Sequence, residues 1–370
     1  MQYTITALDL HFLSKELQEL LNAKVVKVYQ PEKTDLIFVM HLPGKGKKIL
    51  RIILPGSIFL TDFKGEVPQE PLHFCMALRK YLNNSRLRQI NQLGFERILQ
   101  FVFSTKDAIF HLYIELFGAG NVIFCTEDDT IKFALITKKW KDRVIRGNMG
   151  YEYPKKQYNF LTITKQELSE IIKTSNKDSI VKTIAMDLGL GGVYAEELCY
   201  MSGIDKNKKK LTASDTEKLF ASIKKLRNAK LNPHELKKDD KVTKVYPIKL
   251  HMDNLEKVDS FCLALGNLLT EKVIKSQEEK KHLVKTKELR RVEKVIAKQE
   301  EKIKELQETI DKNQKIGEHI FLKYTEIDEI LKEINKATKK YSWKEIKAKL
   351  KNHKIIKQIN EKNKEIVIDI

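Results

Sequence analysis

The sequence predicts a multidomain α+β protein. Its 370 residues exceed the roughly 150 residues of an average domain, and a hydrophobic content of 42% is enough for buried cores. The apolar pattern then changes along the chain. Strand-like alternation dominates residues 1–165, amphipathic helical runs fill residues 166–232, and residues 256–370 contain a heptad repeat from Leu289 to Ile334.

Residues 1–165 are expected to form an antiparallel β domain flanked by two helices, at 8–22 and 71–84. The first of these helices places five leucines on one face. Runs rich in β-branched and aromatic residues alternate with turn residues and predict strands at 24–30, 35–42, 48–54, 57–63, 96–103, 109–117, 121–127 and 130–136. Strands joined by short turns, with few helical crossovers, indicate a sandwich or a barrel.

Two charges, Glu96 and Arg97, stand side by side within an apolar run, QLGFERILQF, at residues 92–101. On a strand, neighbouring side chains point to opposite faces, so the two charges cannot both avoid what the strand buries. Spacing alone favours a solvated surface strand, on which each charge contributes less than about 1 kcal/mol. The alternative is a contact with RNA, because the planar guanidinium of Arg97 suits a phosphate or a base edge.

The helical segment, residues 166–232, contains two amphipathic runs separated by Gly189, Gly191 and Gly192. Glycine permits a tight turn, and the backbone N–H groups that open the next helix can bind an anion. The pattern fits a helix-hairpin-helix module that holds a nucleic-acid backbone. It fits an ordinary helical hairpin with a glycine cap equally well.

A polar linker with one short strand is expected at residues 233–255, followed by a coiled-coil segment at 256–370. Apolar residues recur every three or four positions from Leu289 to Ile334, with Asn313 and Gly317 among the few breaks. Such a seam needs a partner helix, so we expect antiparallel self-association, a bend near Asn313 and Gly317, or disorder. Ten lysines against two acidic residues make residues 331–360 a strongly basic tip, which is either a solvated face or a docking surface.

The formal net charge is +19 and the isoelectric point is near 9.4, which favours a polyanionic partner. Nucleic acid is the first expectation and an anionic membrane the second. The chain shows no apolar run long enough to span a bilayer and no recognisable signal peptide, so a cytoplasmic location without a membrane partner is expected. Its four cysteines stand far apart in apolar surroundings, which predicts buried thiols rather than a metal site.

Several motifs in order resemble the NFACT family of ribosome quality-control factors. The resemblance rests on segments spread over the whole chain: ALDLHFLSKEL at 7–17, PLHFCMALRKYL at 71–82, GFERI at 94–98, IELFGAGNVI at 114–123, YEYP at 151–154, LGLGGVYAEEL at 188–198 and SWKEIKAKL at 342–350. The family implies an N-terminal domain similar to the N-terminal fold of formamidopyrimidine-type DNA glycosylases. A helix-hairpin-helix and a coiled-coil middle domain follow it in the family.

The resemblance also implies a function. Members of the family bind a large ribosomal subunit that carries an obstructed nascent peptidyl-tRNA, recruit charged tRNA, typically alanyl-tRNA, and promote untemplated C-terminal tailing. The ribosome supplies the peptide-bond chemistry, so neither catalytic residues nor a cofactor or metal is expected. The chain ends at KEIVIDI, and we expect it to lack the returning coiled-coil helix and the C-terminal domain, as a truncated or a natural short form.

The family's acid–arginine pair, usually Asp-Arg, corresponds to Glu96 and Arg97, and the acid of the opening motif corresponds to Asp9. We therefore expect Arg97 to contact tRNA directly, with Glu96, Asp9 and Glu115 shaping the same patch. The resemblance likewise assigns Gly189, Gly191 and Gly192 to an RNA backbone.

Two other functional classes fit the sequence less well. A DNA glycosylase with lyase activity shares the domain order, but it would begin with Pro-Glu to supply a nucleophilic amine and would carry a zinc finger; this chain begins Met-Gln and has no cysteine pairs. A surface adhesin that binds fibronectin would need an export signal, which the N-terminus does not resemble.

Overall fold

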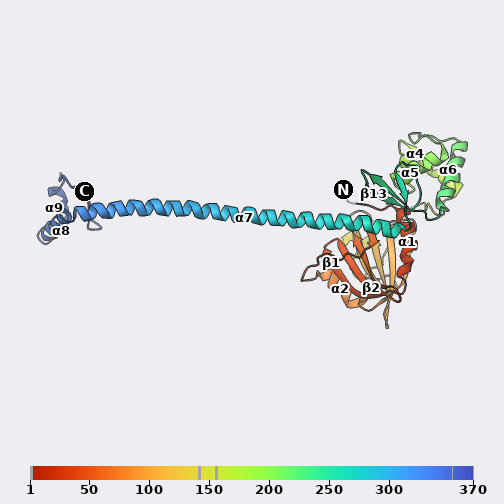
Figure 1. Ribbon diagram of the computed structural model, residues 1–370, viewed down its shortest axis with the longest axis horizontal. Helices are drawn as coiled ribbons and strands as arrows, with labels where there is room; N and C mark the ends of the chain where they lie inside the picture. Colours follow the sequence, from red (N-terminus) through yellow and green to blue (C-terminus); the bar gives the residue numbers. More distant parts are fainter. Residues whose placement is uncertain (1–2, 141–142, 155–156, 352, 370) are drawn as a thin grey trace. The chain divides into compact units, whose positions relative to one another are not determined.

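The computed structural model describes residues 3–140, 143–154, 157–351 and 353–369, and the chain divides into two compact units, residues 1–277 and 278–370 (Figure 1). Helix α7 (Phe261–Leu322) begins in the first unit and continues in the second. The predicted antiparallel β domain, helical segment and long helix are all confirmed.

The β domain of the first unit is one nine-stranded antiparallel sheet in the order β4-β3-β2-β1-β5-β6-β7-β8-β9. The sheet curls on itself. Phe38 on β2 and Phe103 on β6 stack with ring centroids 6.4 Å apart, whereas three strand spacings would separate them by about 14 Å in a flat sheet. The strands are β1 (Lys24–Glu32), β2 (Asp35–Leu42), β3 (Gly46–Ile53), β4 (Ser57–Leu60), β5 (Arg86–Gln92), β6 (Ile98–Ser104), β7 (Ile109–Glu115), β8 (Asn121–Thr126) and β9 (Ile131–Ala134).

Three helices close the core of this sheet. Helix α1 (Ala7–Glu16) continues as a 3₁₀ turn, η1 (Leu17–Leu20), and buries the predicted leucine face. Helix α2 (His73–Leu82) buries Cys75, Leu78 and Leu82. The first turns of α7 bury Phe261, Leu265 and Leu268 in the same core.

A second core holds the helical segment, which comprises α3 (Lys165–Thr174), α4 (Ile180–Met186), α5 (Gly192–Ser202) and α6 (Ala213–Arg227). Leu8 and Phe12 of α1 belong to this core, so α1 packs against both the sheet and the helices. Residues 233–255, where one strand was expected, contribute to a three-stranded sheet of β12 (His234–Lys238), β13 (Lys241–Tyr246) and β14 (Leu255–Lys257). A two-residue pair, β10 (Lys138–Lys139) and β11 (Val144–Ile145), completes the first unit.

The second unit carries most of α7 and a small folded tip. Helices α8 (Tyr324–Thr338) and α9 (Trp343–Lys349) pack with the hairpin β15 (Ile356–Asn360) and β16 (Glu365–Ile368) around four buried isoleucines. The expected bend near Asn313 and Gly317 is wrong, because α7 runs through both positions and is interrupted only at Lys323. One glycine weakens a helix by about 1 kcal/mol but removes no backbone hydrogen bond, so the helix continues.

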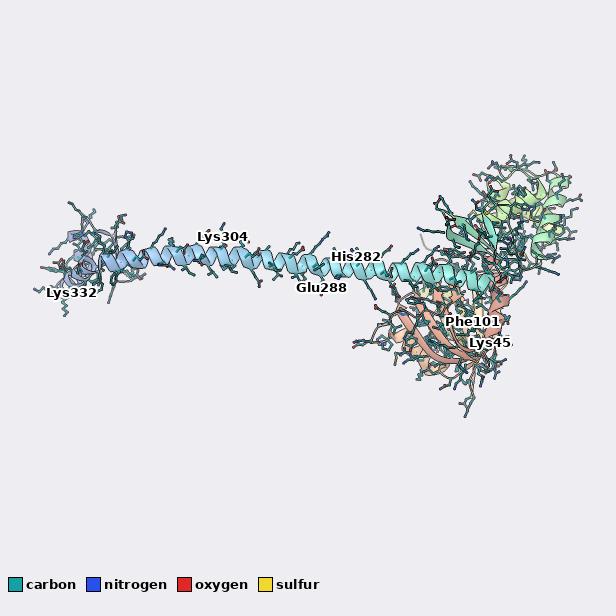
Figure 2. All side chains as sticks on the ribbon, in the orientation of Figure 1. Lys45, Phe101, His282, Glu288, Lys304 and Lys332 are labelled. Atoms are coloured by element: carbon teal, nitrogen blue, oxygen red, sulfur yellow. The ribbon has the colours of Figure 1, made fainter. Side chains whose placement is uncertain are left out.

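The apolar seam of α7 lies on the surface of the second unit. Leu289 is 54% exposed, Ile303 65% and Ile310 55%. Figure 2 shows His282, Glu288 and Lys304 projecting from the same helix into solvent, and Lys332 on the tip. Self-association through this seam stays a prediction.

Two glycines of α7 provide a matched test of its packing. A Cβ atom at Gly266 would lie 2.2 Å from the carbonyl oxygen of Leu60 on β4, whereas a Cβ at Gly317 would meet nothing within 4 Å. Gly266→Ala should therefore lower the free energy of unfolding of the first unit by about 1–3 kcal/mol or more, because backbone atoms must move. Gly317→Ala should be neutral or raise helix stability by up to about 1 kcal/mol.

Urea unfolding followed by tryptophan fluorescence separates the two effects. The chain has two tryptophans, and in a Trp343→Phe background the signal of Trp140 reports the first unit alone. Equal midpoints for the two alanine variants would contradict the close packing of α7 on β4.

Candidate nucleic-acid interface

Glu96 and Arg97 lie in the turn between β5 and β6, because β6 begins at Ile98. The expectation that both residues stand on a strand, on opposite faces, is wrong. Gly94 adopts a φ of +57°, and the Glu96 N–H donates to the carbonyl of Leu93 at 3.1 Å, which closes the turn. Glycine reaches this left-handed conformation at no steric cost, so the sequence QLGFERI encodes a tight turn before the strand.

The turn is fixed to its neighbours through backbone groups. The Gln92 side-chain amide donates to the carbonyl of Glu96 and to the carbonyl of Ala7, each at 2.9 Å. The Leu116 N–H donates to the carbonyl of Arg97 at 2.8 Å. The start of α1, the Glu96–Arg97 turn and the end of β7 are therefore held together, as the sequence assignment requires for a shared patch.

The Arg97 guanidinium is half-buried and keeps its donors unused. Among the residues that the structure describes, it takes part in no hydrogen bond or salt bridge, and its one electrostatic neighbour is the adjacent Glu96. Burial lowers the pKa of Arg97, and the Glu96 carboxylate opposes that change. An arginine remains charged under these conditions. A cation with five available N–H donors, fixed on a rigid turn, can bind a phosphate or a base edge.

Asp9 lies beneath the surface, with 7% of its area exposed. Its carboxylate accepts hydrogen bonds from the Thr6 N–H at 2.8 Å and the Thr6 hydroxyl at 2.9 Å. The Asp9 N–H donates to the Thr6 hydroxyl oxygen at 3.1 Å, and together with the Thr6 N–H bond it forms the capping box of α1. The Tyr194 hydroxyl of α5 donates to the other carboxylate oxygen of Asp9. Burial raises the pKa of Asp9 above its ordinary value, and these hydrogen bonds oppose the rise. The residue thus joins α1 to the helical hairpin.

Glu115 at the end of β7 is 3% exposed. Its carboxylate is paired with Arg143 and accepts a hydrogen bond from the Tyr151 hydroxyl at 3.0 Å. Burial raises the pKa of Glu115, while Arg143 and Tyr151 oppose the rise. The carboxylates of Asp9 and Glu115 thus have hydrogen-bond or salt-bridge partners inside the protein. Because both are buried, neither is exposed as a contact surface beside Arg97.

The three glycines of the hairpin have different surroundings. Gly189 and Gly191 adopt φ of +69° and +77°, and a Cβ at Gly191 would lie 3.2 Å from the Thr6 methyl group. Gly191 therefore faces the cap of α1. Gly192 is exposed at the first position of α5, where a Cβ would meet nothing within 4 Å and no side chain caps the helix. The free backbone N–H groups of α5 are accessible here.

Sequence reasoning missed the residues that hold the patch in place: Gln92, Arg143 and Tyr194. Tyr194 and Asp9 are 185 positions apart in the chain, so no local pattern could pair them. A weak signal did exist. Tyr194 belongs to the apolar run directly after the glycine turn, where a tyrosine hydroxyl must find a partner once it is buried.

Other classes of site were sought among the described residues. No helix there is long and apolar enough to cross a membrane, and no cluster of three or more His, Cys, Asp or Glu side chains could bind a metal. The cysteines at positions 75, 125, 199 and 262 are buried free thiols, as predicted.

Comparison with known proteins gives one family match and several relatives. The family described as NFACT N-terminal and middle domains matches residues 6–366. The archaeal Rqc2 homolog aRqcH of Methanocaldococcus jannaschii is 33% identical over 397 aligned residues, which cover all of this chain and 58% of that protein. The human ribosome quality control complex subunit NEMF is 29% identical over 245 residues, covering 61% of this chain and 22% of that protein.

A solved structure supports the fold. The N-terminal part of the fibronectin/fibrinogen-binding protein from Streptococcus suis aligns with a TM-score of 0.58 at 22% identity, over 72% of this chain and all of that one. The present chain spans about three-fifths of the archaeal relative and about a fifth of the human one.

The buried Asp9 predicts a pH-dependent stability. Its pKa in the folded state lies above the ordinary 3.8, so the fold favours the protonated form. The contribution of Asp9 to the free energy of unfolding is complete below its pKa in the unfolded chain. This contribution declines as pH rises through its pKa in the folded protein. The stability advantage of the wild type over Asp9→Asn, which is neutral at every pH, should shrink as pH rises above about 4.

Urea unfolding at a series of pH values measures this difference. Tyr194→Phe serves as the control for the hydrogen bond. It should lower the free energy of unfolding by about 1–3 kcal/mol, because it removes a donor from a buried carboxyl. If the stability advantage of the wild type grows with pH, the folded protein stabilises the ionised form of Asp9, and the prediction is wrong.

Proposed function

The chain belongs to the NFACT family, and from this premise we propose that it acts in ribosome-associated quality control. In this proposal it binds the large ribosomal subunit that carries an obstructed nascent peptidyl-tRNA. It recruits a charged tRNA, typically alanyl-tRNA, for untemplated C-terminal tailing. The protein acts as a binding factor in the cytoplasm, and the ribosome performs the peptide-bond chemistry.

The unused guanidinium of Arg97 is the observation that carries this proposal. It stands on a turn that α1 and the end of β7 hold in place, and no described residue neutralises it through a salt bridge. The net charge of +19 supplies the long-range attraction for RNA. Arg97 is proposed as the direct tRNA contact.

The three acids have supporting roles in this proposal. Asp9 and Glu115 are buried and satisfied, so they shape the patch by holding α1 and β7 beside the turn. Glu96 tunes the guanidinium electrostatically. It is one methylene longer than the aspartate that the family usually carries and has the same charge.

The hairpin supplies a second, weaker contact with an RNA backbone. Of its three glycines, Gly192 is the one that opens to solvent at the start of α5. Backbone N–H groups and the helix dipole favour a phosphate there. Gly189 and Gly191 provide the left-handed turn that aims α5.

Arg97→Ala should reduce tRNA recovery about tenfold or more while large-subunit association persists, because one charge-assisted contact contributes about 1.5–3 kcal/mol. Glu96→Asp should leave both tRNA recovery and subunit association nearly unchanged. Both variants are made in the full chain, with subunit association scored by sedimentation and tRNA scored in the same pellets.

Arg146→Ala removes an exposed arginine from the same unit and is the matched control for charge. Arg97→Lys keeps the charge without the planar fork and should recover only part of the tRNA. Normal tRNA recovery by Arg97→Ala would remove the turn from the interface.

Gly192→Glu separates binding from folding at the hairpin. A carboxylate in the first turn should stabilise α5 by about 0.3–1 kcal/mol, yet it should weaken subunit binding by repelling a phosphate. Gly192→Gln has a similar size without the charge and should bind almost normally. If the two variants bind equally well, the hairpin is structural only; binding and melting temperature are measured on the same preparations.

A further inference from the structure

A basic hollow lies at the opposite end of β5 from the Glu96–Arg97 turn. Its volume is about 540 Å³, and its lining includes Lys24 of β1, Arg86 and Arg88 of β5, and Lys106 of the turn after β6. One acidic residue, Asp107, shares the lining. Six residue steps along β5 separate Arg86 from Gln92, so the hollow lies about 20 Å from the turn.

Neutral acceptors orient the two arginines. The Arg88 guanidinium donates to the Ser104 hydroxyl and to the side-chain oxygen of Asn22, each at 2.8 Å. The Arg86 guanidinium donates to the backbone carbonyl of Asn22 at 3.1 Å. These bonds fix both planar groups without cancelling their charge, and each keeps further N–H donors.

Strand alternation places both arginines in the hollow. Arg86 and Arg88 are two residues apart on β5 and are both exposed, while Leu87 between them is buried in the core. The register of β5 against β6 then shifts between Leu87 and Gln89, which is a β-bulge. Gln89 is exposed as well, and Ile90 returns to the core.

The four cations of the hollow are unpaired among the described residues: none of Lys24, Arg86, Arg88 and Lys106 forms a salt bridge there. By contrast, Arg51 and Arg143 of the same unit are paired with acids, Arg51 with Asp35 at 2.5 Å and Arg143 with Glu115. Four positive charges around one hollow repel one another, and a polyanion would relieve that repulsion.

We propose that this hollow is a second RNA-binding site, which holds the phosphodiester backbone through Arg86 and Arg88 with Lys24 and Lys106 beside them. The choice of RNA as the polyanion rests on the proposed function. The site reads no bases, since its donors suit phosphate oxygens. Together with Arg97 it would fix an RNA at two points of one rigid sheet.

The test measures binding of the full chain to purified large ribosomal subunits between 50 and 400 mM KCl, values chosen to cover about a decade of salt. Arg86→Gln/Arg88→Gln should lower the slope of log affinity against log salt by about 1.4 to 1.8, since each lost phosphate contact contributes about 0.7 to 0.9. Arg88→Lys, which keeps the charge, should leave the slope nearly unchanged.

The matched control, Lys165→Gln/Lys237→Gln, removes two lysines that already pair with Glu217 and Glu256, each at 2.5 Å. For this control, the slope of log affinity against log salt should change by less than half of the change expected for Arg86→Gln/Arg88→Gln. A double arginine variant that melts normally and keeps the wild-type slope overturns this site and leaves the proposed function standing. A wild-type chain whose subunit binding is absent or independent of salt overturns both.

Discussion

The buried carboxylate of Asp9 is the interaction on which the rest of the first unit depends. It caps α1 through Thr6 and accepts the hydroxyl of Tyr194, so it fixes the first helix to the helical hairpin. The same helix starts beside the Gln92 amide that fixes the Glu96–Arg97 turn. A buried carboxyl without these donors would cost several kcal/mol. The position of Arg97, the proposed RNA contact, thus depends on a buried acid.

Burial sorts the charges of the first unit into two groups. Its buried acids, such as Glu115, have partners inside the protein, whereas cations of the turn and the hollow are positioned by neutral groups or by backbone. Cations that no acid neutralises are therefore left on the surface of this unit, where they can attract a polyanion. Its buried carboxylates meanwhile have hydrogen-bond partners inside the protein.

Much of the fold could be predicted from local patterns. Alternation located eight of the nine strands of the large sheet but not β5, and the 3.6-residue period located α1, α2 and the hairpin helices, because burial of one face dictates both periods. The errors share a cause. The Glu96–Arg97 turn depends on one left-handed glycine within an apolar run, and β12 lies between β13 and β14, so that small sheet depends on pairing among three strands. At the site, the identity of Arg97 followed from resemblance, but its support by Gln92 and Tyr194 arises from contacts across the chain that local periodicity does not record.

The exposed apolar seam of α7 gives ionic strength two opposing effects on this molecule. Salt weakens the attraction between the basic surface and RNA. It also shortens the range over which like-charged copies of the chain repel one another, to about 3 Å at 1 M. Leu289, Ile303 and Ile310 remain exposed throughout, and their tendency to leave water does not depend on charge. The high-salt condition that would release the proposed RNA partner is therefore the one in which the colloidal stability of the protein is lowest.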